Sequence, residues 1–240
     1  ELHSIARGEQ GRLSSTALTS LRSQRRELRE GGALRGEAVF KTIRHLSGVA
    51  LLRANSPLTV QLVLNRLLAL KIPVDARLAT AGMSAALRCD APDLGVLYFD
   101  ALTLGGGTAD SRAYTSLIKV HAAAGRVAEA LSVERRMSAE RVPPSERTYN
   151  TLMAVCARGG DRKGMLKYFT LMGGIGGSKE GQDRTPTVES WNILLDYCAR
   201  HVSGPGRVLQ AEDVMTRMRK QGCPPDTVSY SCLARAYVAA

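Results

Sequence analysis

The sequence predicts an all-α protein in which helix-turn-helix units of 35 residues stack into an α-solenoid. Two tyrosines, Tyr114 and Tyr149, lie 35 residues apart, and each opens an apolar pattern of helical spacing. Glycine or proline residues follow these patterns at the places where a helix has to end. A pair of short helices cannot bury its apolar face alone, so stacked neighbours share one continuous core.

Length and hydropathy set the broad class of the protein. The chain has 240 residues, of which 44% are apolar, and this is enough to bury a continuous core. Its apolar runs are interrupted well before the roughly 20 residues that a bilayer span needs, so we expect no membrane partner. The chain begins with Glu1 rather than Met and ends inside an apolar pattern. We therefore expect a piece of a longer protein, which a targeting peptide could precede.

Net charge and cysteine content indicate the kind of partner and the redox compartment. The net charge of +11, from 33 basic against 22 acidic residues, favours a polyanionic partner. The alternative is that GC-rich coding alone explains the many arginines. The five cysteines are widely spaced and form no CxxC pair, so neither a disulfide framework nor a zinc site is indicated. This usage fits a reducing compartment.

The first 40 residues form a separate N-terminal segment. A helix is predicted over about residues 15–30, where Leu18, Leu21 and Leu28 recur at helical spacing. Arginines share the polar side of this helix with acidic residues, which is typical of a solvated face. The segment is interpreted either as a helix of its own or as a degenerate repeat.

Residues 41–240 are predicted to form the solenoid. The first unit holds one helix near residues 39–53 and a second that is capped by Ser56, starts at Pro57 and runs to Leu70. Two later units are longer than 35 residues, and loops absorb such insertions at little cost. The predicted repeats span residues 41–75, 76–110, 111–145, 146–187 and 188–226, with a half repeat at 227–240.

Several features recur together in these units: an aromatic residue that opens the first helix, a glycine at the turn, an apolar second helix that ends near a methionine, and closing prolines. The residues that carry them are 148–150, 125–126, 129–131, Met137 and 224–226. In this combination the chain resembles the pentatricopeptide repeat family, strongly over residues 111–240 and more weakly over 41–110. The Trp, Leu-Gly, Tyr signature of the related 34-residue tetratricopeptide repeat does not occur here.

The resemblance implies a right-handed α-solenoid that binds single-stranded RNA, with about one base for each repeat. It also implies a role in RNA processing, stability or translation in a mitochondrion or chloroplast. In this family the fifth and last residues of a repeat hydrogen-bond the base edge. The pairs implied here are Thr80 with Asp110, Thr115 with Ser145, Asn150 with Thr187, and Asn192 with Asp226. Read from the RNA 5′ side, they would select G, a purine, a pyrimidine and U.

These residues have a second interpretation as helix caps, because Thr, Ser, Asn and Asp are favoured at helix starts. The second residue of each repeat, which packs on the base in the family, is usually aliphatic, and only Val228 conforms. Arg77, Arg112 and Arg147 could instead stack on bases or hold phosphates, or form a solvated or protein-binding face. Glu189 departs from this pattern and would repel phosphate.

The sequence predicts no enzyme, cofactor, metal site or small-molecule substrate. The four histidines are scattered over different units, and no HExxH, P-loop or GxGxxG context occurs. Two function classes therefore remain. One is a sequence-selective RNA-binding adaptor. The other is a solenoid scaffold that mainly contacts other subunits of a large organellar ribonucleoprotein or transcription assembly.

Overall fold

The computed structural model describes residues 36–173, 185–204 and 206–239. These residues form eleven α-helices and no strand. The helix predicted over residues 15–30 lies outside the described residues. The helices are α2 (Gly36–Arg53), α3 (Pro57–Ala69), α4 (Ala76–Arg88), α5 (Pro92–Leu104), α6 (Ser111–Ala123), α7 (Val127–Ala139), α8 (Glu146–Arg158), α9 (Arg162–Leu171), α10 (Val188–His201), α11 (Gly206–Lys220) and α12 (Thr227–Val238).

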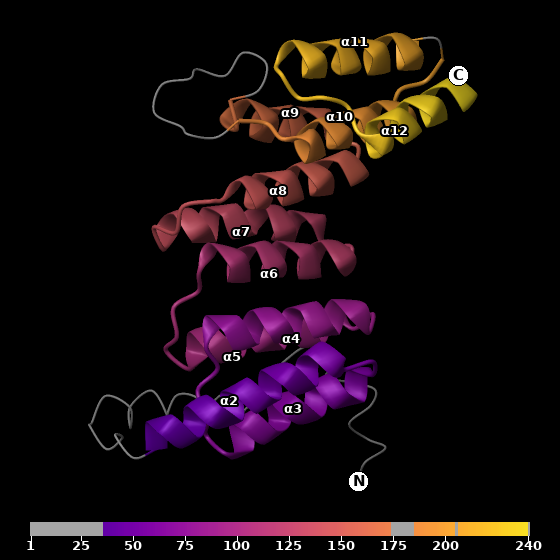
Figure 1. Ribbon diagram of the computed structural model, residues 1–240. Coiled ribbons are helices and arrows are strands. Elements are labelled where there is room, and N and C mark those ends of the chain that lie inside the picture. The colour runs from indigo at the N-terminus through magenta and orange to yellow at the C-terminus, as the bar shows by residue number, and fades with distance from the viewer. Residues whose placement is uncertain (1–35, 174–184, 205, 240) are drawn as a thin grey trace. The chain divides into compact units, whose positions relative to one another are not determined.

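The chain divides into two compact units between Pro143 and Pro144. The first unit contains α2 to α7 and the second contains α8 to α12 (Figure 1). Within each unit, helices that follow one another across a short turn pack together as hairpins. Neighbouring hairpins also contact each other, as α4 does with both α2 and α6. The prediction of an all-α fold of stacked helix-turn-helix pairs is thus confirmed.

The start of the first unit differs in detail from the prediction. Helix α2 begins at Gly36, three residues earlier than the expected start near residue 39. Ser56 does precede α3, but its side chain makes no capping hydrogen bond. Pro57 at the first helical position still favours this helix start, because its φ angle suits a helix and it has no N–H to leave unpaired.

The core of the first unit depends on a close approach between α4 and α5. Gly82 of α4 lies against the ring of Tyr98 of α5, where a Cβ atom would come within 2.3 Å of a ring carbon. The Tyr98 side chain is fully buried, and its hydroxyl donates to the carbonyl oxygen of Val60 at 2.8 Å. Burial raises the pKa of Tyr98, so it remains a neutral donor that ties α5 to α3.

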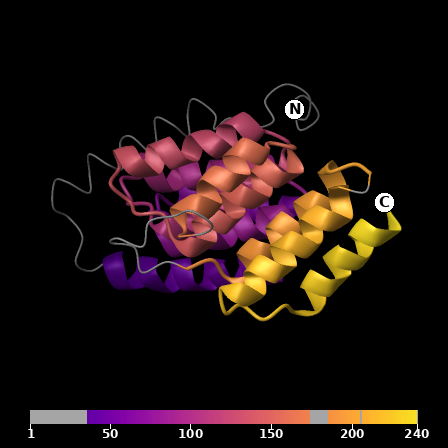
Figure 2. The same ribbon diagram turned by 90° about the horizontal axis from the view of Figure 1, so that it is seen from above.

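The second unit is built around α10. Its Trp191 is fully buried and meets the ring of Phe169 edge-on, with ring centroids 4.8 Å apart. Figure 2 shows α12, in yellow, beside α11 at the C-terminal end of this unit, and α12 also contacts α10. An apolar cluster fills the space between these three helices. It consists of Leu195, Cys198, Ala199, Ala211, Met215, Cys232 and Ala236.

All five cysteines are free thiols, as the sequence predicts. Cys156 and Cys198, which occupy equivalent places in successive first helices, are both buried. Burial raises the pKa of the Cys198 thiol. A buried neutral thiol behaves as a small apolar side chain, so the structure supports a packing role for Cys198.

Several loops between helices contain one residue in the left-handed conformation. Gly106 has this role after α5, with φ of 83°, and Arg141 has it 35 residues later, with φ of 57°. A non-glycine residue in this region costs roughly 1–2 kcal/mol, whereas glycine adopts it freely. Arg141 is also exposed, so its side chain gains little from packing.

Replacing Arg141 with glycine is expected to raise the free energy of unfolding by up to about 1 kcal/mol. The relief of backbone strain exceeds the greater entropy that glycine brings to the unfolded chain. Urea denaturation followed by circular dichroism measures the change. The matched variant Gly106→Arg is expected to destabilise the protein. Equal stability of Arg141→Gly and the wild type would contradict this account.

Candidate functional site

The predicted site residues lie around the N-terminal turns of α4, α6, α8, α10 and α12. The residue before each of these helices is an N-cap in extended conformation. These N-caps are Asp75, Asp110, Ser145, Thr187 and Asp226. The capping interpretation is therefore correct for Asp110, Ser145 and Asp226, whose side chains accept a backbone N–H of the helix that follows, and any base contact there has to coexist with it.

Asn192 and Asp226 are brought together in the second unit. The side-chain amide of Asn192 donates to Oδ1 of Asp226 at 3.1 Å. The same Oδ1 accepts the backbone N–H of Ser229 at 2.8 Å. These hydrogen bonds, led by the one from Ser229, lower the pKa of Asp226, so the carboxylate is ionised at neutral pH. The Ser229 hydroxyl lies 2.9 Å from the same Oδ1, and a hydrogen bond from the Val228 backbone also lowers the pKa of this carboxyl.

Asn150 and Thr187 are also brought together, but in a more enclosed setting. The amide nitrogen of Asn150 lies 3.4 Å from the Thr187 hydroxyl and donates to a carboxylate oxygen of Glu189 at 3.3 Å. Its carbonyl oxygen accepts from the Ser190 hydroxyl at 2.7 Å. The Asn150 residue is only 2% exposed, so its polar atoms are already satisfied inside the protein.

Thr80 and Asp110 lie in the first unit without a direct hydrogen bond between them among the described contacts. The Thr80 hydroxyl donates to the carbonyl oxygen of Ala76 at 2.7 Å. Asp110 accepts the backbone N–H of Ala113 through Oδ1 at 2.8 Å. Both side chains retain acceptor capacity, because a hydroxyl that donates once can still accept and a carboxylate has two oxygens.

Thr115 belongs to the first unit and Ser145 to the second. Thr115 is 4% exposed, and its hydroxyl donates to the carbonyl oxygen of Ser111 at 2.7 Å. Ser145 forms a capping box with Thr148, whose backbone N–H lies 3.2 Å from the serine hydroxyl oxygen. Local hydrogen bonds thus engage both hydroxyls.

The side chains at the second position of the first helices differ in their surroundings. Arg77, Arg112 and Arg147 are exposed and have no ion-pair partner among the described residues. Val228 is 53% exposed. Glu189 is exposed as well, but its carboxylate accepts the hydrogen bond from Asn150.

Two serines that sequence reasoning missed complete the arrangement. Ser190 and Ser229 are fully buried, and each donates to the carbonyl oxygen of the preceding asparagine, Asn150 at 2.7 Å and Asn192 at 2.6 Å. The signal for them was a capping-box spacing, in which Thr187 precedes Ser190 and Asp226 precedes Ser229 by three residues. Through these hydrogen bonds, a serine on one first helix fixes the orientation of the asparagine on the first helix of the preceding unit.

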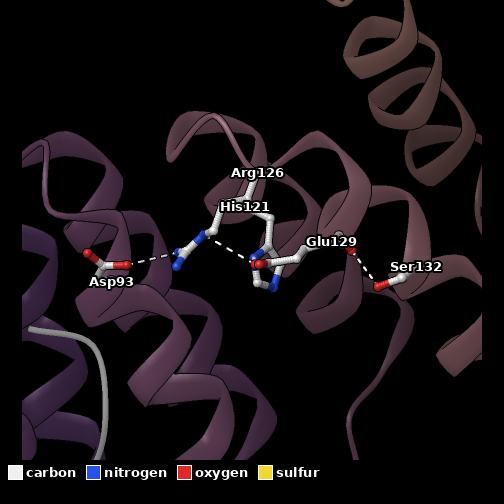
Figure 3. A network of polar contacts seen from close by, with 5 residues as sticks. All are labelled: Asp93, His121, Arg126, Glu129 and Ser132. Carbon is white, nitrogen blue, oxygen red and sulfur yellow. Dashed lines mark hydrogen bonds and ion pairs between the residues drawn. The ribbon is translucent and has the colours of Figure 1, made fainter.

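A separate polar cluster lies at the turn between α6 and α7. Figure 3 shows Arg126 between two carboxylates, with Nη2 at 2.9 Å from Asp93 and Nε at 3.3 Å from Glu129. The Nδ1 atom of His121 lies 3.0 Å from the same Glu129 carboxylate. We attribute the two Arg126 contacts mainly to charge attraction, because neither Nη2 nor Nε makes a well-aligned hydrogen bond.

This cluster connects the turn to the preceding hairpin. Burial, assisted by the charge of Arg126, lowers the pKa of His121 even though Glu129 acts in the opposite direction. Arg126 joins Asp93 of α5 to Glu129 of α7, which connects two neighbouring hairpins.

The described residues contain no group of three or more His, Cys, Asp or Glu residues that could hold a metal ion. None of the described helices is both long enough and apolar enough to cross a bilayer.

Comparison with known proteins gives the family. A pentatricopeptide repeat family model matches residues 109–158 and 186–239, and a model of the single repeat matches residues 147–176. A pentatricopeptide repeat-containing protein of Arabidopsis thaliana is 27% identical over 135 residues, which are 55% of this chain and 22% of that protein. The chain therefore spans well under half the length of this relative.

Solved structures of one protein of this family are also similar. The pentatricopeptide repeat protein PPR10 in complex with an 18-nt psaJ RNA element has a TM-score of 0.44 and 19% identity, covering 75% of this chain and 30% of that one. The structure of PPR10 from maize has a TM-score of 0.43 and 16% identity, covering 99% of this chain and 43% of that one. The two family models together match about half of the chain, and the chain belongs to the pentatricopeptide repeat family.

Proposed function

We propose that this chain binds single-stranded RNA along the N-terminal turns of its first helices, as part of a longer protein. Family membership and the net charge of +11 support this proposal. The observation that carries it is the Asn192–Asp226 pair, which offers an amide donor beside an exposed, ionised carboxylate. The first proposed repeat spans residues 41–75, and the later ones begin at the first residues of α4, α6, α8, α10 and α12.

The chemistry of this pair matches uracil. Asn192 has one amide hydrogen without an acceptor among the described residues, and Asp226 presents an exposed carboxylate. Uracil presents an N3–H donor next to carbonyl acceptors, so the carboxylate accepts from N3 while the amide donates to a carbonyl oxygen. Cytosine presents an acceptor at N3, which a carboxylate repels. The half-exposed Val228 supplies an apolar surface for the base face.

The other pairs are proposed to act with different selectivity. Thr80 and Asp110 offer two acceptors, which match the N1–H and exocyclic amino donors of guanine. A pyrimidine contact at Asn150 with Thr187 requires Asn150 to release one of its present acceptors. Arg77, Arg112 and Arg147 are proposed to stack on bases or bind phosphates.

The variant Asn192→Thr is expected to shift the preference for the last nucleotide from U toward G. Threonine replaces the amide donor with a hydroxyl, so the pair becomes equivalent to Thr80 with Asp110. A change of one or two base-edge hydrogen bonds predicts about a three- to tenfold change in relative affinity. Fluorescence anisotropy measures it with short labelled RNAs carrying G, purine, pyrimidine and U in order, against permuted RNAs.

The matched control is Asn65→Thr, which makes the same substitution on the exposed side of α3, away from the proposed reading positions. It is expected to leave both affinity and preference unchanged. Binding that falls steeply with salt but is indifferent to sequence in every variant would mean phosphate contact only. That result would contradict base reading by this chain.

We further propose an organellar setting, in a mitochondrion or chloroplast, with a role in the processing, stability or translation of transcripts. Imaging of the full-length protein fused to a fluorescent protein tests the location. The second candidate function is a scaffold in a large organellar assembly. The engagement of Thr80, Thr115 and Asn150 in internal hydrogen bonds favours this alternative. Sequence-indifferent RNA binding together with stable co-purification of partner subunits would support it.

A further inference from the structure

The second unit contains the same asparagine arrangement twice, and the two copies differ in one side chain. Asn150 and Asn192 occupy equivalent positions on α8 and α10, and both accept a hydrogen bond from a buried serine of the next first helix. Both also direct their amide nitrogen toward the N-cap of that helix. The residue two positions after the N-cap is Glu189 in one copy and Val228 in the other.

Glu189 changes the hydrogen bonding of the first copy. Its Oε2 atom accepts from the Asn150 amide at 3.3 Å, so both amide hydrogens of Asn150 have acceptors, in Glu189 and Thr187. Val228 offers no acceptor in the second copy, where the Asn192 amide donates to Asp226. The carboxylate of Glu189 therefore already accepts the amide hydrogen of Asn150 that a base edge would have to contact.

Charge reinforces this effect. Glu189 is exposed and has no ion-pair partner among the described residues, so its negative charge faces solvent beside the asparagine. An RNA backbone that passes this position meets repulsion. The next copy presents an uncharged valine instead.

We infer that Glu189 closes the Asn150 site, so that this repeat selects no particular base while the following repeat, with Val228, does. The inference rests on the proposed RNA binding and makes Glu189 a residue that sets specificity by occupying a reading site. The selective contact of this unit is then confined to Asn192 and Asp226. The nucleotide on the 5′ side of the selected U is bound without preference.

A reciprocal exchange of the two side chains tests this inference. The variant Glu189→Val gives the first copy the side chain of the second, and Val228→Glu does the reverse. Binding is measured by fluorescence anisotropy against RNAs in which only the nucleotide facing Asn150, or only the one facing Asn192, is varied among the four bases. Circular dichroism confirms that each variant is folded.

The expected result is that Glu189→Val gains about a three- to tenfold preference for a pyrimidine at the nucleotide facing Asn150. Val228→Glu is expected to lose the preference for U at the nucleotide facing Asn192. The variant Glu189→Gln separates the two causes, because glutamine keeps an acceptor for Asn150 but carries no charge. It is expected to bind RNA more tightly without gaining a pyrimidine preference.

Failure of the inference is distinguishable from failure of the proposed function. If the wild type selects U opposite Asn192 but Glu189→Val gains no preference opposite Asn150, the site is not closed by Glu189. A wild-type preference at the nucleotide facing Asn150 would overturn the inference in the same way. If neither the wild type nor any variant binds RNA, the proposed function itself is wrong.

Discussion

Replacing Trp191 with alanine is expected to lower the free energy of unfolding by about 3–5 kcal/mol. Trp191 is fully buried in the second unit, and its ring packs edge-on against Phe169 at 4.8 Å. Alanine leaves a large cavity, because α9 and α10 cannot collapse into it without disturbing their other contacts. Urea denaturation followed by circular dichroism measures the loss, since the variant lacks the only tryptophan of the chain.

Two variants control for this result. Trp191→Phe is expected to cost much less than Trp191→Ala, because it keeps an aromatic ring and removes an indole N–H that has no acceptor among the described residues. Val238→Ala changes a side chain that is 90% exposed and is expected to be nearly neutral. A cost below about 1 kcal/mol for Trp191→Ala would contradict the packing described for this unit.

Replacing Gly82 with alanine is expected to destabilise the first unit by about 1–3 kcal/mol or more. The added Cβ would lie 2.3 Å from the Tyr98 ring, and this ring cannot move freely. It is buried, and its hydroxyl is held by the Val60 carbonyl oxygen at 2.8 Å. Thermal and urea unfolding followed by circular dichroism measure the effect.

Gly48 provides a matched control, because its replacement by alanine is expected to change the free energy of unfolding in the opposite direction. It lies inside α2, and no atom is within 4 Å of the position where its Cβ would be. Glycine is about 1 kcal/mol less favourable than alanine within a helix, so Gly48→Ala is expected to stabilise the protein. If Gly82→Ala were as stabilising as Gly48→Ala, the close contact between α4 and α5 would be wrong.

Much of the fold could be predicted from local patterns. The N-cap residues Asp110 and Asp226 stand immediately before the helices that they cap, because capping is a contact over three residues of one chain segment. Helical spacing of apolar residues likewise identified which faces are buried, as at Tyr114 and Trp191. These features depend on neighbours in the sequence, so they are readable from it.

The hydrogen bonding of each proposed base-reading pair could not be predicted in this way. Asn150 and Asn192 occupy equivalent positions in the sequence, yet one is enclosed by Glu189 and the other keeps an amide hydrogen available. The difference arises from a residue 39 positions away on the next first helix. Contacts over such separations depend on how two helices pack.

The sequence by itself determined the helices, their capped starts and the family, because these follow from spacing and from residue types that act locally. Only the tertiary structure decided which polar side chains are engaged. Neighbouring first helices bring Ser190 to Asn150 and Ser229 to Asn192, and the hydrogen bonds formed there set how much donor and acceptor capacity remains for a ligand. The packing of the helices sets this remaining capacity. It differs between the Asn192 site and the Asn150 site.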